Sequence, residues 1–124
     1  SSLMAAAIFD EAAARRALPV RSLSRGVNPD ASVPPAIAAA MGRDGFDVVN
    51  FRPQALSEQD VAGAVRVIAI GVDLSQHQGL ARAPITLWND VPPAPVDYAR
   101  TRDDLTRHIE ALLDELQQTG MKPQ

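Results

Sequence analysis

The stretch Val65–Leu74, VRVIAIGVDL, is apolar at nearly every position from Val65 to Ile70. A strand that is apolar on consecutive residues is buried on both faces, which is typical of a parallel sheet covered by helices. A second buried strand is predicted at Ile85–Trp88, ITLW, before a proline-rich loop that cannot continue a ladder of hydrogen bonds. We expect these two strands to run parallel, because the connections around them contain helices.

Helical patterns alternate with these strands. The clearest is the last, in which Leu105, Ile109 and Leu113 belong to one apolar stripe and Gly120 is a natural stop. Helices are predicted near residues 3–17, 34–42, 58–63 and 100–118, and VRSLS at Val20–Ser24 predicts a further strand. Strands alternating with helices predict one α/β domain over residues 1–124, with a doubly wound parallel sheet between two layers of helices.

The first helix begins almost at the first residue of SSLMAAAIFDEAAARR. Its inner face carries Met4, Ile8 and Ala12 and is suited to close packing on a sheet. A doubly wound sheet normally begins with a strand that turns directly into the first helix, and ligands bind at that turn. The pattern therefore predicts that the first strand of the sheet is missing from residues 1–124, in the region where function usually resides.

Composition excludes several classes of function. The net charge of −3, with acidic and basic residues interleaved, gives no basic stripe for nucleic acid. No apolar run approaches the roughly 18 residues of a membrane span, and no leader pattern is present, so a cytoplasmic protein is expected. The sequence has no cysteine, which excludes disulfides and thiolate nucleophiles within it. His77 and His108 have no ligand-type partners at a metal spacing, so surface positions are expected for both and neither a metal nor a cofactor is predicted.

Short motifs along nearly the whole chain resemble one known family. SSLMAAAIF, at Ser1–Phe9, is similar to the segment after the phosphate-binding loop of low-molecular-weight protein tyrosine phosphatases and the thioredoxin-coupled arsenate reductases that share their fold. In that family a C-x5-R-S loop is followed by residues close to P-M-A-E-A-I-F. The other matches are SRGV (24–27) with Ser-Ala-Gly-Thr, PAIAAAMGRDGFDVVNFRPQAL (35–56) with the arsenate-reductase pattern ending in H-R-P-K-x-L, VAGAVRVIAIGVDL (61–74) with D-L-V-V-T-M-G, and TLWNDVPPAP (86–95) with W-x-(L/V)-P-D-P.

This resemblance implies a three-layer sheet with a flavodoxin-like strand order, and it also implies a mechanism. The family's cysteine thiolate attacks phosphorus, its arginine grips two phosphate oxygens, and its aspartate protonates the leaving group. In the matched register the cysteine position falls before residue 1, the arginine position is Ser1 and the aspartate position is Pro93. Ser2 matches the serine of the motif. None of the three catalytic roles is filled, and thiol-relay arsenate reduction is excluded because no cysteine follows Val61–Leu74.

Other residues around the matched loop keep alternatives open. Asp90 or Asp97 could supply a proton from another position, although an aspartate in a proline-rich loop more often makes turn hydrogen bonds or caps a helix. Trp88 could line a ligand cleft, but an aromatic residue at a strand end more often belongs to the core. The first N–H groups after Ser1 and Ser2 offer a partial positive charge to a phosphate-like anion.

Three hypotheses follow for function. The first is a degenerate phosphatase-like protein that binds an anion or a protein partner. The second is an active phosphatase whose cysteine-bearing loop lies upstream of Ser1. The third is a homo-oligomer in which the sheet is completed by a strand from another copy, because the missing strand would leave two strand edges unpaired.

Overall fold

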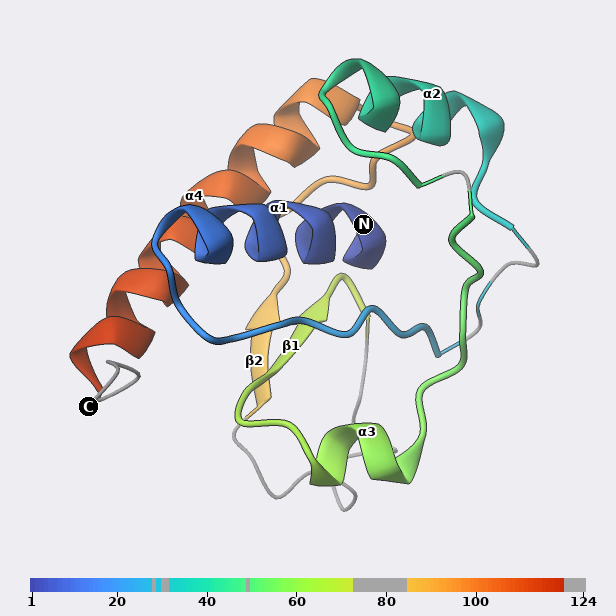
Figure 1. Cartoon of the computed structure of the whole chain (residues 1–124). Helices are drawn as coiled ribbons and strands as arrows, with labels where there is room; N and C mark the ends of the chain where they lie inside the picture. The colour runs from blue at the N-terminus through green and yellow to red at the C-terminus, as the bar shows by residue number, and fades with distance from the viewer. Residues whose placement is uncertain (28, 30–31, 49, 73–84, 120–124) are drawn as a thin grey trace.

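A computed structural model describes residues 1–27, 29, 32–48, 50–72 and 85–119 (Figure 1). Its elements are α1 (Ser2–Arg15), α2 (Pro35–Arg43), α3 (Glu58–Ala62), β1 (Val67–Ile70), β2 (Ile85–Trp88) and α4 (Tyr98–Gln118). The four predicted helices are present, each within two residues of its predicted bounds. Among the described residues, no helix has both the length and the apolar character that crossing a membrane requires.

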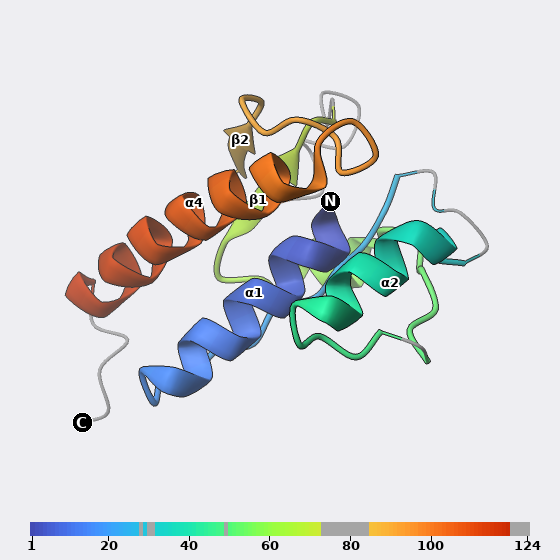
Figure 2. The same cartoon turned by 90° about the horizontal axis from the view of Figure 1, so that it is seen from above.

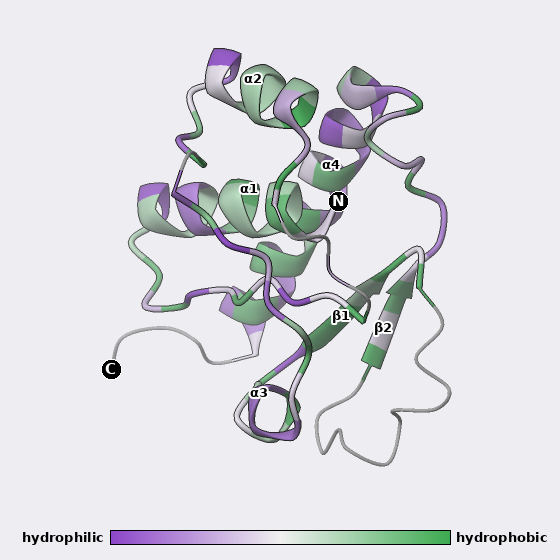
Figure 3. Ribbon diagram, turned by 90° about the vertical axis from the view of Figure 1, so that its right-hand side faces the viewer, coloured by the Kyte–Doolittle hydropathy of each residue, from purple (hydrophilic) through white to green (hydrophobic). Residues whose placement is uncertain are grey.

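The sheet joins β1 and β2 in parallel, as the sequence predicts. Val67 pairs with Ile85 and Ile70 pairs with Trp88 at the two ends of the register. Both strands are hydrophobic along nearly their whole length (Figure 3). α1 lies on one side of these strands and the short α3 on the other (Figures 1 and 3). The chain therefore has an α/β fold built around a small parallel sheet.

The predicted strand Val20–Ser24 does not form as a strand. A strand is defined by its ladder of hydrogen bonds to a neighbour, and within the described residues this segment has none: the Ser22 N–H donates instead to the Asp10 carboxylate of α1, at 2.8 Å. Two residues beyond this segment, Gly26 forms an isolated parallel bridge with Ala55. The prediction of a strand at Val20–Ser24 is therefore wrong.

The core lies mainly between α1 and α4, which pack side by side (Figure 2). Met4, Ile8 and Ala12 of α1 are buried, as the alanine-rich face predicts. The predicted stripe of α4 is buried along its whole length, from Leu105 to Leu116. The outer ends of the two helices are joined by the Arg16 guanidinium, which donates to Glu110 at 2.5 Å and to Asp114 at 2.8 Å.

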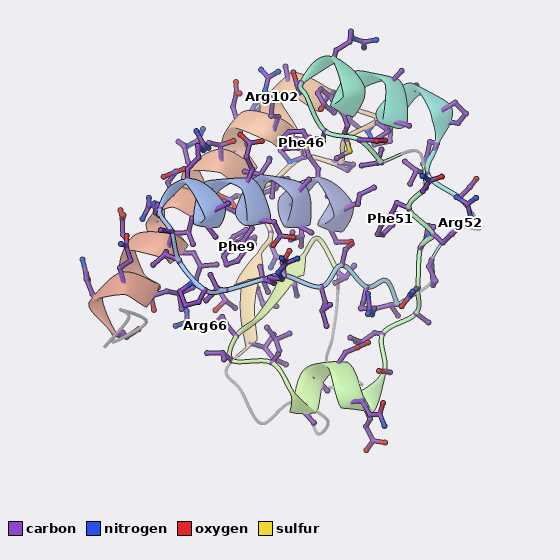
Figure 4. The ribbon with its side chains drawn as sticks, viewed as in Figure 1. Phe9, Phe46, Phe51, Arg52, Arg66 and Arg102 are labelled. Carbon is purple, nitrogen blue, oxygen red and sulfur yellow. The ribbon has the colours of Figure 1, made fainter. Side chains whose placement is uncertain are left out.

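The amino-terminal end of α4 is joined to the end of α2 through one carboxylate. The Tyr98 hydroxyl donates to Asp44 Oδ2 at 2.8 Å, and Arg102 Nη1 lies 3.3 Å from both carboxylate oxygens (Figure 4). The hydrogen bond from Tyr98, followed by the contacts with Arg102, lowers the pKa of Asp44. Burial, followed by the hydrogen bond to Asp44, raises the pKa of Tyr98 to about 12. The ionised carboxylate and the neutral phenol therefore stabilise the folded state together.

The lowered pKa of Asp44 and the raised pKa of Tyr98 predict a loss of stability at both ends of the pH range. Asp44 contributes fully to the free energy of unfolding above its ordinary pKa of about 3.9. This contribution is lost as the pH falls through the lower pKa of the folded state. The contribution of Tyr98 is complete below the ordinary pKa of about 10 and is lost as the pH rises toward 12. Tyr98→Phe should abolish the alkaline loss and weaken the acid loss, measured as free energy of unfolding in urea across pH.

A direct measurement checks the same pair. Tyr98 is the single tyrosine of the sequence, so phenolate absorbance reports its ionisation alone. A midpoint near the ordinary value, or identical pH profiles for the wild type and Tyr98→Phe, would contradict the role assigned to this hydrogen bond.

Candidate functional site

A cavity of about 830 Å³ lies in the middle of the molecule. Its long sides are the extended segment 19–27 and residues 65–72, which include β1. Side chains of α1 and α4 and of α3 complete the wall, together with Trp88, Val91 and Pro93 after β2. We call this cavity the central groove. Phe9 extends from α1 toward the strands and forms part of its lining (Figure 4).

Four residues singled out by the sequence meet on this wall, namely Ser1, Ser2, Trp88 and Pro93. Ser1 precedes α1 as its N-cap residue, and its carbonyl accepts a hydrogen bond from the Ala5 N–H at 2.9 Å. The side chain of Ser1 makes no capping hydrogen bond. The Ser2 hydroxyl lies 3.0 Å from the Ser24 hydroxyl and so ties the start of α1 to the extended segment. The N-terminus of α1 therefore borders the groove.

Two charged residues of the groove were not predicted as site residues. Arg25 Nε donates to Asp60 Oδ2 at 3.0 Å, and both side chains are largely shielded from solvent, at 21% and 19% exposure. The Ser57 hydroxyl is the main cause of the lowered pKa of Asp60, with Arg25 adding to it. The same Asp60 carboxylate completes the capping box of α3 with Ser57, so Arg25 and the start of α3 share it.

Trp88 belongs both to the core and to the groove, since it lines the groove and is only 7% exposed. The His108 ring of α4 stacks on it, with ring centroids 4.6 Å apart. His108 Nε2 also lies 2.9 Å from Asp90 Oδ1, and this contact is the main cause of the lowered pKa of Asp90. The His108 side chain is 29% exposed, so it is partly solvated as expected. The sequence did not predict its contacts with Trp88 and Asp90, which meet beside α4 after β2.

The two candidate proton donors lie outside the groove's described lining. Asp90 is engaged by His108, as above. Asp97 is the N-cap of α4, and its side chain accepts a hydrogen bond from the Arg100 N–H at 3.1 Å. Both carboxylates thus make local structural contacts. His77 lies outside the described residues.

The described lining of the groove contains serine hydroxyls. No three histidine, aspartate or glutamate side chains come close enough there to hold a metal ion. The full sequence contains no cysteine. What the groove combines is an apolar interior, two strand-like backbone edges and the N-terminus of a helix.

These features define an α/β domain with a groove at the start of its first helix. No protein-family model matches the sequence, and no curated protein matches it. The structure is similar to the crystal structure of YfkJ from Bacillus subtilis, with a TM-score of 0.75. The sequences are 21% identical, and the similarity covers 94% of this chain and 87% of YfkJ. At this level of identity the similarity establishes the fold alone.

Proposed function

We propose that this chain is a catalytically degenerate relative of the low-molecular-weight protein tyrosine phosphatases, with their three-layer sheet, and that it acts by binding. One observation carries the proposal. Ser1, Ser2 and Pro93, which the sequence resemblance matches to the arginine, serine and aspartate of the phosphatase site, are far apart in sequence but line the same groove. Convergence of these positions is what a site of that family requires.

The chemistry of the three positions supports binding rather than turnover. A serine hydroxyl at Ser1 cannot grip two phosphate oxygens as a planar guanidinium does, and Pro93 has no proton to give to a leaving group. The first N–H groups of α1 have no partner within the helix and remain available to an anion or to a polar group of a protein partner. A phosphate-like anion held by these groups alone should bind weakly and be released by salt.

The alternative function is an active low-molecular-weight phosphatase whose cysteine-bearing loop precedes Ser1 in a longer polypeptide. The size of the groove supports this alternative. Its volume of about 830 Å³ next to Ser1 is large enough to hold a further segment of the chain. Under this alternative the groove belongs to a catalytic site, and the longer polypeptide hydrolyses phosphomonoesters.

We expect no hydrolysis of an aryl phosphate by the 124-residue chain, and no gain from Pro93→Asp. Loss of a general acid alone costs a factor of about 10²–10⁴, but restoring it has no effect without a group that attacks phosphorus. The measurement is release of the phenol by homogeneous protein, with Pro92→Asp as the matched control. The same preparation is titrated with inorganic phosphate at low and high salt, where weak, salt-sensitive binding is expected.

Turnover at an ordinary enzymatic rate would overturn the proposed function. If that turnover survived Ser1→Ala and Ser2→Ala together, the active site would lie elsewhere in the molecule. Tight phosphate binding that persists in high salt would also contradict a site made of backbone N–H groups alone.

A further inference from the structure

His108 joins α4 to the turn after β2 through two contacts of one ring. Its imidazole stacks on the Trp88 indole, with ring centroids 4.6 Å apart and an angle of 17° between the ring planes. Nε2 of the same ring lies 2.9 Å from Oδ1 of Asp90 and 3.1 Å from Oδ2. One side chain of α4 therefore holds the start of the loop that carries Pro93.

The contact with Asp90 leaves one nitrogen of the ring available for a second proton. Because the pKa of Asp90 is lowered, mainly by the hydrogen bond from His108, its carboxylate is ionised at neutral pH. An ionised carboxylate only accepts hydrogen bonds, so we assign the hydrogen of the neutral ring to Nε2. Nδ1 has no hydrogen bond to any residue that the structure describes, and the side chain is 29% exposed. Nδ1 can therefore take a proton from water while the hydrogen bond to Asp90 stays intact.

A second proton makes the ring cationic at both of its contacts. Histidine is the side chain whose charge ordinarily changes between about pH 5 and 8. A cation within about 6 Å of an indole centroid is attracted by the π-electrons of that ring. The hydrogen bond to Asp90 becomes an ion pair, and hydrogen bonds between charged groups are stronger than those between neutral ones. Both contacts of His108 therefore strengthen when the ring is charged.

The other charged groups beside the ring are already paired with one another. On α4, Arg107 is the next residue before His108 and Asp104 lies one turn earlier. The Arg107 guanidinium donates to Asp104, and Arg100 lies 3.6 Å from the same carboxylate. From the turn after β2, the charged group that faces the ring is Asp90. Among the described residues, Asp90 is therefore the carboxylate that pairs with a charge on His108.

We propose that His108 is a pH-sensitive clamp on the loop after β2, which holds Trp88 and Asp90 more tightly when the ring takes up a second proton. Trp88 and Pro93 both line the central groove, so acidification fixes this part of its wall. The added stability is complete below the ordinary histidine pKa of about 6.5 and is lost as the pH rises beyond it. This proposal rests on the proposed function, because it describes the regulation of the site to which Pro93 belongs.

The first test follows Trp88 emission, which reports on the stack directly because the sequence has one tryptophan. A charged imidazole quenches a stacked indole by accepting an electron from it. We expect the emission of the wild type to fall along one titration curve between about pH 8 and about pH 5. His108→Gln should abolish this fall. The matched control is His77→Gln, which removes the only other histidine and should leave the curve unchanged.

The second test measures how strongly the clamp holds, by urea unfolding of the wild type and His108→Gln. Glutamine can still donate a hydrogen bond to Asp90 but stays uncharged. The unfolding constant of His108→Gln, divided by that of the wild type, should be about two- to fivefold larger near pH 5.5 than near pH 8. In an Asp90→Asn background the same ratio should depend less on pH, because the stack remains but the ion pair is lost.

Asp90→Asn also provides a test that does not require His108→Gln to fold. Its emission should still fall on acidification, but with a midpoint at a lower pH than in the wild type, because the carboxylate that favours the charged ring is gone. Equal midpoints would overturn the proposal.

Three further outcomes would also overturn it. They are wild-type emission that does not change with pH, an emission curve that persists in His108→Gln, and a ratio of unfolding constants that is the same at both pH values. All of these measurements use the protein without ligand. They are therefore distinct from failure of the proposed function, which is read from hydrolysis of an aryl phosphate and from phosphate binding.

Discussion

Leu113→Ala should lower the free energy of unfolding by about 2–5 kcal/mol. Leu113 is completely buried on the face of α4 that packs against α1. Truncation removes the transfer free energy of the lost methyl and methylene groups and leaves a cavity between two helices that cannot fully close. A domain of this size has a total stability of about 5–15 kcal/mol, so the variant should unfold at a much lower urea concentration.

The control for this prediction is Leu87→Ala, the same truncation at a side chain that is 55% exposed on β2. Its cost should be under about 1 kcal/mol, because little apolar surface is returned to water. Both values come from urea unfolding followed by circular dichroism, with the dependence on urea compared between variants. Equal losses for the two variants would mean that the interface between α1 and α4 is not the main source of stability.

The elements with a strong periodic signal could be predicted from the sequence. α4 repeats its apolar residues at helical spacing from Leu105 to Leu116, and this stripe is the buried face in the structure. The continuous apolar run around β1 correctly predicted parallel pairing with β2. Each of these elements carries its own local pattern of apolar residues, which is why its type could be predicted.

Two other features that depend on contacts between distant segments were not predicted. VRSLS at Val20–Ser24 was predicted as a strand, but a strand also needs a neighbour, and the local sequence does not say whether one is present. The contact of His108 with Trp88 and Asp90 joins α4 to the turn after β2, and no local pattern encodes it. Tertiary packing brings these side chains together, so single-sequence reasoning did not predict their contact.

The candidate site was predicted only in part for the same reason. The family resemblance matched Ser1, Ser2 and Pro93 to one site, and all three line the central groove. Resemblance could do this because it transfers a known arrangement of distant segments. It could not reveal the ion pair of Arg25 with Asp60, since neither residue belongs to a matched catalytic position.

A buried hydroxyl of α4 contacts the loop that carries Pro93. Pro92, Pro93 and Pro95 have no N–H, so this loop has few backbone hydrogen bonds with which to hold its shape. Thr101 of α4 is completely buried, and its Oγ1 donates to the Pro92 carbonyl at 2.6 Å. The same hydroxyl lies 2.9 Å from the Asp97 carbonyl, which also accepts a hydrogen bond from the Thr101 N–H.

Thr101→Val should therefore lower the free energy of unfolding by about 1–3 kcal/mol, because valine keeps the shape of threonine but cannot donate a hydrogen bond to the Pro92 carbonyl. Thr101→Ser keeps the hydroxyl and should lose only about 1 kcal/mol for the missing methyl group. The matched control is Thr106→Val one turn later on α4, where the hydroxyl donates to the Arg102 carbonyl at 2.8 Å.

Because the Arg102 carbonyl lies within a helix and keeps its backbone donor, Thr106→Val should change stability by less than about 0.5 kcal/mol. Urea unfolding gives the three stabilities, and Trp88 emission reports whether the loop beside it has shifted. Equal effects of the two valine substitutions would show that contacts within the proline-rich loop, and not the hydrogen bond from Thr101, hold its shape. A larger loss for Thr101→Val, restored by Thr101→Ser, would assign the placement of Pro93 at the groove to this one hydrogen bond.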